Sequence, residues 1–91
     1  MELKDYRNQI DRIDDEIVRL FQERMDVAAQ IAKFKQDNGL PILQSARERE
    51  KLDTLCRAVE PTLRPDLREL YGLLFTLSRR HQAAVLHREE P

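Results

Sequence analysis

Apolar residues recur every three or four positions along the first part of the chain. The stripe comprises Leu3, Tyr6, Ile10, Ile13, Ile17, Leu20, Val27, Ile31 and Phe34. This spacing returns repeatedly to one face of an α-helix, and neither Gly nor Pro occurs within residues 2–38. Gly39 and Pro41 follow, so we predict one helix over residues 2–38 that Gly39 caps and Pro41 ends.

The predicted helix is longer than the domain that contains it. At about 1.5 Å per residue it would extend roughly 55 Å, whereas a compact globule of this chain length is about 30 Å across. One end of the apolar stripe would therefore protrude into water. A second copy of the chain can cover that stripe, and we predict an intertwined helical homodimer.

Two further helical segments follow the long one. We predict the first over residues 46–59, with Ser45 and Glu48 at the spacing of a capping box. The prolines of "EPTLRP" then interrupt the helical pattern. We predict the last helix from about residue 66 to residue 88, with the final "REEP" frayed. The apolar residues that predict its inner side are Leu67, Leu70, Tyr71, Leu74, Leu77 and Val85.

The fold class follows from these patterns. The chain contains no alternating, strand-like stretch and no internal repeat. Two Gly and four Pro, beside 36% charged residues, also favour helices over a sheet. We therefore predict an all-α fold with three helices per protomer, one of them very long, in a single domain covering residues 1–91.

The charge balance and the single cysteine restrict the possible partners. The 16 basic and 17 acidic residues nearly cancel, so neither nucleic acid nor a membrane is an expected partner. Cys56 is alone, which excludes an intramolecular disulfide and is typical of a reducing compartment. The N-terminus lacks the apolar run of a secretory signal, and no segment approaches transmembrane length, so we predict a cytoplasmic protein.

A cation interrupts the apolar stripe of the first helix. The period predicts an apolar residue at position 24, where the chain has Arg24, and Lys35 follows eleven residues later. The two share a face about 16 Å apart, so their side chains could bracket a substituted six-membered ring. Arg7 lies about 25 Å from Arg24 and is rotated by roughly 100°. It could reach the same pocket only from the partner in an antiparallel dimer.

The later helices contribute more polar groups. Arg47 and Glu48 lie in the first turn of the second helix, and Ser78 and Gln82 form an i, i+4 pair on the third. Together with Arg24 they predict a cationic pocket with neutral donors, one carboxylate and apolar walls. Such a pocket suits a small dianion and stabilises charge without covalent chemistry. The two histidines lack partners at metal-ligand spacing, and no Gly-rich phosphate loop is present.

Three segments carry a family resemblance. The run "YRNQIDRIDDEIVRLFQERMDVAAQIAKFK", then "LPILQSARERE", then "SRRHQ", resembles the all-helical (AroQ-type) chorismate mutase family over about residues 3–86. The resemblance implies an intertwined dimer of the chorismate mutase II type. It also implies the rearrangement of chorismate to prephenate, in the shikimate pathway toward phenylalanine and tyrosine, with neither cofactor nor metal.

The resemblance also implies a role for each cation. Arg24 and the partner's Arg7 would clamp the substrate carboxylates through planar guanidinium forks. Arg47 would add positive charge nearby, aided by its helix N-terminus. Lys35 and Gln82 would donate hydrogen bonds to the ether oxygen between the ring and the enolpyruvyl side chain. Lys35, Gln82 and Arg24 are accordingly the expected catalytic residues.

The remaining candidates would bind other parts of the substrate. Glu48 would hold the ring hydroxyl, and Ser78 would contact a carboxylate. Gln44 stands where the family commonly has an acidic residue that contributes to the hydroxyl contact. Its amide could still form a hydrogen bond there, so the departure affects fine tuning more than the reaction.

Each candidate also has a structural explanation. Arg7 could pair with Asp11 at i+4. Arg24 could extend from the apolar stripe to solvent, or it could offset a buried acid. Lys35 could balance the helix dipole, and the predicted capping box would account for Glu48. The order and joint spacing of these residues favour a shared site.

Two other functions stay open. A lyase that releases pyruvate from isochorismate shares the fold, although lyase-like relatives tend to lose the acid that stands here as Glu48. A non-enzymatic helical dimerisation module would keep the dimer without needing Arg24 or Lys35. Turnover measured with both substrates separates these possibilities.

Overall fold

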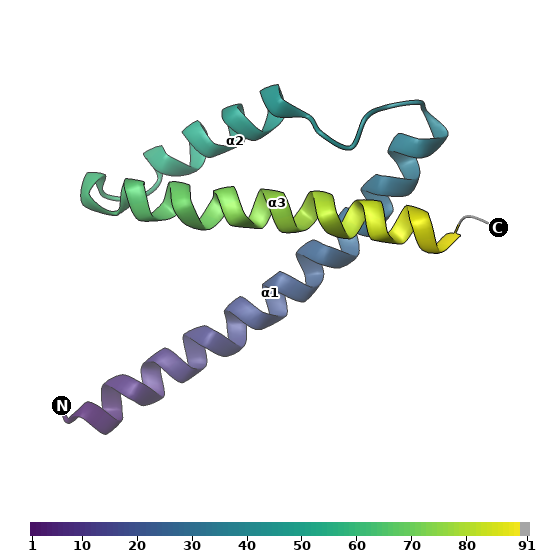
Figure 1. The fold of residues 1–91 in the computed structure, drawn as a ribbon. Helices are drawn as coiled ribbons and strands as arrows, with labels where there is room; N and C mark the ends of the chain where they lie inside the picture. Colours follow the sequence, from purple (N-terminus) through teal and green to yellow (C-terminus); the bar gives the residue numbers. More distant parts are fainter. Residues whose placement is uncertain (90–91) are drawn as a thin grey trace.

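The computed structural model describes the backbone of residues 1–89 and the side chains of residues 1–87. Its elements are, in order, α1 (Leu3–Asp37), α2 (Ser45–Arg57), the short 3-10 helix η1 (Pro61–Leu63) and α3 (Arg64–Glu89). The described residues contain no strand, so the predicted all-α fold is confirmed. Figure 1 shows α3 crossing the C-terminal half of α1, with α2 lying alongside α3.

The ends of α1 follow from local chemistry. At the start, the backbone N–H of Glu2 donates to Asp5 Oδ2 at 2.9 Å, which satisfies a donor that the helix leaves unpaired. At the end, Gly39 has φ +65° and the N–H of Leu40 donates to the carbonyl of Lys35 at 2.8 Å. This pattern is a Schellman cap, and it confirms that the helix stops at Gly39.

Replacing Gly39 by alanine is expected to destabilise the fold by about 1 kcal/mol, because a Cβ is strained at positive φ. No atom lies within 4 Å of the position that this Cβ would occupy, so a steric clash makes no contribution. Gly39→Asn is the control, since Asn tolerates the left-handed region better. Denaturant unfolding measures both variants, and an equal loss in the two would contradict the conformational explanation.

Helices α2 and α3 differ slightly from the predicted bounds. Helix α2 covers Ser45–Arg57 in place of residues 46–59, and α3 begins at Arg64, two residues before the predicted start. Pro65 thus lies in the first turn of α3, where its missing N–H costs no hydrogen bond. Residues 88–89 continue α3 and are not frayed, whereas residues 90–91 lie outside the described residues.

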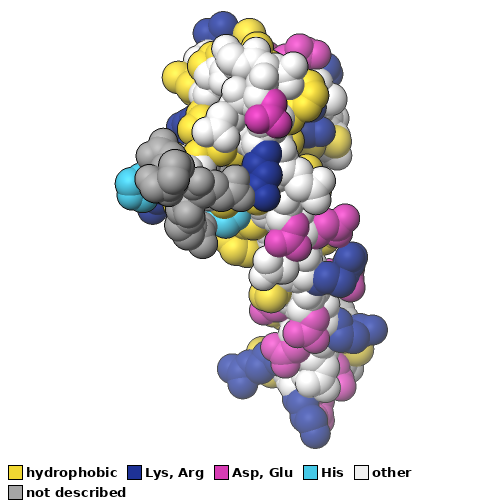
Figure 2. Space-filling model, turned by 90° about the vertical axis from the view of Figure 1, so that its right-hand side faces the viewer, with side chains coloured by type: hydrophobic (Ala, Val, Ile, Leu, Met, Phe, Trp, Pro, Cys, Tyr) yellow, Lys and Arg dark blue, Asp and Glu magenta, His cyan; other side chains and the backbone are white. Residues whose placement is uncertain are grey.

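The overhang of α1 is confirmed in the single chain. The molecule measures 56 × 28 × 14 Å, and the N-terminal part of α1 projects away from α2 and α3 (Figure 1). Figure 2 shows this projecting arm carrying acidic and basic side chains intermixed. The apolar residues of the arm that are at least half exposed include Leu3, Tyr6, Ile10, Ile13, Ile17 and Leu20.

The core lies where α3 crosses α1. Ala28 and Ala32 of α1 are buried, and their small side chains allow a close approach of α3. Phe75 and Gln82 of α3 are also buried; seven residues apart, they lie within about 20° on the same helix face. The predicted inner side is confirmed in part, because Leu67, Tyr71, Leu74, Leu77 and Val85 are half-buried, but the most buried face is rotated toward Phe75 and Gln82. Leu70, predicted to face inward, is 52% exposed in the single chain.

Helices α2 and α3 are also joined at their shared end. Arg64, at the start of α3, donates from Nε to the carbonyl of Cys56 at 2.7 Å. This bond satisfies a carbonyl in the last turn of α2, where helical partners run out. Cys56 itself is buried and unpaired. Among the described residues, no helix is apolar enough over a sufficient length to cross a membrane.

Candidate functional site

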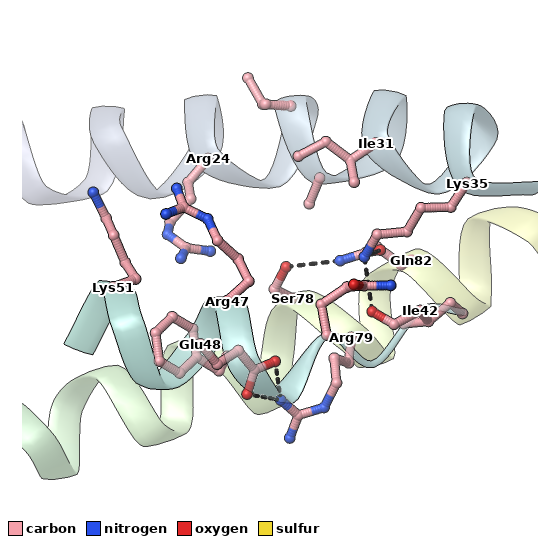
Figure 3. A pocket seen from close by; sticks show the side chains of 14 residues that line it. Arg24, Ile31, Lys35, Ile42, Arg47, Glu48, Lys51, Ser78, Arg79 and Gln82 are labelled. Atoms are coloured by element: carbon pink, nitrogen blue, oxygen red, sulfur yellow. Dashed lines mark hydrogen bonds and ion pairs between the residues drawn. The ribbon is translucent and has the colours of Figure 1, made fainter. Parts of the chain in front are cut away.

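A pocket of about 320 Å³ lies between the three helices, near the crossing of α1 and α3 (Figure 3). Its size is in the range of small-molecule sites. Seven of the eight residues predicted for the site line it. They are Arg24, Lys35, Gln44, Arg47, Glu48, Ser78 and Gln82. The fold thus assembles side chains from all three helices and from the loop that follows α1.

Arg24 is partly buried at the crossing of the helices. Its guanidinium carbon lies 5.9 Å from the centre of the Phe75 ring, a cation–π contact between α1 and α3. Phe75 was not among the predicted inner residues of α3. Its ring nevertheless explains how a charged residue is accommodated within the apolar stripe of α1. Arg24 is therefore only partly exposed, and it forms no ion pair with an acid among the described side chains. Neither structural explanation considered for it is supported.

Lys35 lies at the other end of the pocket, in the last turn of α1. Its ammonium donates to the carbonyl of Ile42 at 2.7 Å and to Gln82 Oε1 at 3.1 Å. An ammonium has three N–H donors, so one is left for a ligand. Burial lowers the pKa of Lys35 below its usual value, and the negative charge of Glu48 partly offsets this effect.

Gln82 is 5% exposed and has a hydrogen-bond partner at each end of its amide. Its Oε1 accepts from Lys35, and its Nε2 donates to Ser78 Oγ at 3.1 Å. In this arrangement the carbonyl end of Gln82 faces Lys35. The amide nitrogen has two N–H donors and Ser78 takes one, so one is left for a ligand.

Glu48 does not form the predicted capping box. Helix α2 begins at Ser45 with Gln44 as its N-cap, so Ser45 lies inside the helix and cannot cap it. The Glu48 carboxylate instead accepts from Arg79 Nη1 with both oxygens, at 2.6 and 2.5 Å. Arg79 lies 31 residues away on α3 and was missed from the sequence. Arg79 directly follows Ser78 and precedes Gln82 by three residues, so its place near the face that carries both could have indicated a role in the site.

Gln44 is held by its own loop. Its Nε2 donates to the carbonyl of Pro41 at 2.9 Å, while its side chain lines the pocket beside Glu48. Glu48 is therefore the only carboxylate among the residues that line the described pocket.

Positive charge gathers at the Arg24 end of the pocket. Figure 3 shows Arg47 and Lys51 extending from α2 toward Arg24 on α1. Lys51 was not predicted, although it follows Arg47 at i+4 and therefore shares its helix face. Three cations at one end of a pocket with apolar walls attract an anionic ligand.

Arg7 lies outside this pocket, on the exposed arm of α1. It makes no ion pair with Asp11 among the described side chains, so its structural explanation is wrong for this chain. The helix geometry had predicted that Arg7 could not reach the pocket of its own chain, and the structure agrees.

These features define a small helical protein with a cationic pocket whose charge and size suit a small anionic ligand. No cluster of three potential metal ligands occurs among the described residues. The chain belongs to the chorismate mutase type II family, whose sequence profile matches residues 6–83.

Several relatives share this region. The T-protein of Haemophilus influenzae is 38% identical over 80 residues, which cover 77% of this chain and 21% of that protein. A bifunctional chorismate mutase/prephenate dehydratase of Aquifex aeolicus is 38% identical over 86 residues, 94% of this chain and 20% of that protein. A chorismate mutase of Methanocaldococcus jannaschii is 34% identical over 58 residues, 60% of this chain and 59% of that protein.

The chain therefore spans about a fifth of the length of the first two relatives and just over half of the third. No solved structure gives a significant match.

Proposed function

We propose that this protein is a chorismate mutase that rearranges chorismate to prephenate for phenylalanine and tyrosine biosynthesis. The observation that carries the proposal is the convergence of Arg24, Lys35, Arg47, Glu48 and Gln82 on one pocket from three helices. Family membership and the names of the relatives support the same reaction.

Lys35 is the centre of the proposed mechanism. The reaction is a [3,3] shift, in which a C–O bond breaks as a C–C bond forms and no proton is transferred. The departing ether oxygen becomes more negative at the transition state, so an ammonium fixed beside it binds that state more strongly than the substrate. The hydrogen bonds to Ile42 and Gln82 hold the ammonium in place before the substrate arrives.

The carboxylates of the substrate would bind at the opposite end of the pocket. Arg24 and Arg47 extend there from two helices, and a guanidinium fork matches a carboxylate bidentately. Holding both carboxylates keeps the enolpyruvyl arm folded over the ring, which contributes to the rate through positioning.

The neutral donors and the acid would complete the fit. Glu48 would accept a hydrogen bond from the ring hydroxyl, with Gln44 beside it in the lining. The second N–H of Gln82 Nε2 would donate to the ether oxygen. Ser78 Oγ accepts from Gln82, so its O–H would be available to donate to a carboxylate.

The exposed arm supports an intertwined homodimer. The side chains of Ile10, Ile13 and Ile17 are each more than half exposed in the single chain. An exposed apolar stripe of this kind is typical of a protein–protein interface. An antiparallel second copy would cover it and bring the partner's Arg7 to the carboxylate end of the pocket. The buried, unpaired thiol of Cys56 also supports a reducing, cytoplasmic location.

The direct test is a chorismate turnover assay on the purified protein with no added metal or cofactor. The expected result is loss of chorismate with an equal gain of prephenate. Release of pyruvate from isochorismate without formation of prephenate would replace the proposal with the lyase. A well-folded dimer that converts neither substrate would instead indicate a non-enzymatic dimerisation module.

The proposed role of Lys35 also predicts a pH profile. Because burial lowers the pKa of Lys35, the ammonium persists below the folded-state pKa and is lost as the pH rises through it. We expect kcat/KM to fall on the alkaline side, at a pH below the 10.5 of an ordinary lysine. The residual kcat/KM of Lys35→Ala should not show this alkaline decrease. A decrease that persists in that variant would arise from the titration of another group.

A further inference from the structure

The ion pair between Glu48 and Arg79 has a consequence for the pocket. Glu48 shares the pocket with Lys35, and its negative charge already acts on the Lys35 ammonium. A carboxylate free to turn toward that ammonium would pair with it and neutralise it. The ether oxygen of the proposed reaction would then face a weaker positive charge.

The observed contacts avoid that pairing. Both oxygens of Glu48 are bonded to Arg79 Nη1, whereas Lys35 is bonded to the neutral oxygens of Ile42 and Gln82. Figure 3 shows the Glu48 carboxylate turned toward Arg79 and away from Lys35. Each carboxylate oxygen has a second acceptor site, so Glu48 can still accept from a ligand hydroxyl.

Arg79 is itself held in position. Its Nη2 donates to Thr76 Oγ1 at 3.3 Å, one turn earlier on α3, and Thr76 donates to the carbonyl of Gly72 at 3.1 Å. The side chains of Arg79 and Glu48 are only 30% and 25% exposed, so water screens their attraction less than at a surface.

We propose that Arg79 is a positioning residue that restrains the Glu48 carboxylate, keeping it apart from the Lys35 ammonium and presenting it to the substrate hydroxyl. This inference rests on the proposed mutase function for its effect on rate. It adds a residue on α3 that acts through Glu48 without touching the reacting atoms.

The first test is a double-mutant cycle. Arg79→Met should lower kcat/KM by roughly tenfold, mainly through kcat, because the released Glu48 pairs with Lys35. Adding Arg79→Met to Glu48→Gln should lower kcat/KM by less than a further twofold, because the Glu48→Gln protein has no carboxylate at this position that could pair with Lys35. Arg80→Met is the matched control, since Arg80 is exposed and does not line the pocket. An equal loss on both backgrounds would overturn the inference and leave Arg79 with a packing role.

The second test does not depend on turnover. NMR titration of the Lys35 side chain should show a higher midpoint in Arg79→Met than in the parent protein, because the released carboxylate stabilises the ammonium. When Arg79→Met is added to Glu48→Gln, the midpoint should not rise above that of Glu48→Gln alone. Arg79→Lys should give a smaller rise than Arg79→Met. The pocket's other charged groups, Arg24, Arg47 and Lys51, are unchanged throughout the series.

The two tests separate the inference from the proposed function. A parent protein that does not convert chorismate would refute the proposed function, while the Lys35 titration would still support or overturn the restraint. An unchanged midpoint in Arg79→Met would overturn the inference, even if the parent protein is a fully active mutase.

Discussion

Replacing Lys35 by alanine is expected to reduce kcat/KM for chorismate roughly 30- to 1,000-fold. This corresponds to a loss of about 2–4 kcal/mol of transition-state stabilisation. The ammonium is the positive group fixed at the end of the pocket opposite the three gathered cations. Without it, the departing oxygen would develop charge with no fixed cation beside it. The loss should appear in kcat as well as in kcat/KM, because the interaction strengthens only at the transition state.

The helical fold should survive this substitution. The pocket is open to solvent, so water can replace Lys35 beside the Gln82 oxygen. Circular dichroism and denaturant unfolding check this point. Lys33→Ala is the control, because Lys33 is exposed, lies about 200° around the helix from Lys35 and does not line the pocket. A folded Lys35→Ala protein with unimpaired kcat/KM would remove the assigned role.

Mixing two inactive variants is expected to restore activity. Arg7→Ala and Arg24→Ala should each abolish most turnover, since each removes a guanidinium from both sites of the proposed dimer. In a mixed dimer, one pocket combines an intact Arg24 with an intact Arg7 from the partner. The other pocket carries both lesions.

Random exchange of equal amounts should therefore restore about a quarter of the parent activity, because half of the dimers are mixed and half of their sites are intact. Native mass spectrometry with one labelled variant verifies that exchange has taken place. The control is a mixture of Arg24→Ala with Lys35→Ala, whose lesions lie in the same chain's pocket. Each pocket takes Arg24 and Lys35 from its own chain, so in this mixed dimer each pocket still carries one lesion. We therefore expect no recovery in the control mixture.

No recovery in the Arg7 and Arg24 mixture after confirmed exchange would remove the shared site. Recovery in the control mixture would also contradict it, because each pocket of that mixed dimer keeps its own lesion. The pair of mixtures thus tests which chain supplies Arg7, once Lys35→Ala has been shown to be inactive by itself.

The restraint on Glu48 links the two ends of the pocket. Three cations at one end would favour the proposed anionic substrate, while stabilisation at the other end would depend on the Lys35 ammonium. A carboxylate between them is useful only where it cannot neutralise that ammonium. The proposed restraint by Arg79 would meet this condition, and Arg79 was not among the residues predicted for the site.

The sequence by itself determined the features that depend on local helix geometry. The spacing of Leu3 to Phe34 gave α1 to within a residue at each end, and Gly39 gave its cap. The same periodicity placed Arg24 and Lys35 on one face and excluded Arg7 from the pocket of its own chain. These properties follow from the rise and rotation per residue, which depend little on the rest of the fold.

Only the tertiary structure decided which side chains meet between helices. The pairing of Glu48 with Arg79 and of Lys35 with Gln82 joins residues 31 and 47 positions apart. The burial of Phe75 under Arg24, and the exposure of Leu70, depend on how α3 is rotated against α1. A sequence period identifies a helix face, but crossing angle and rotation arise from the joint packing of all three helices.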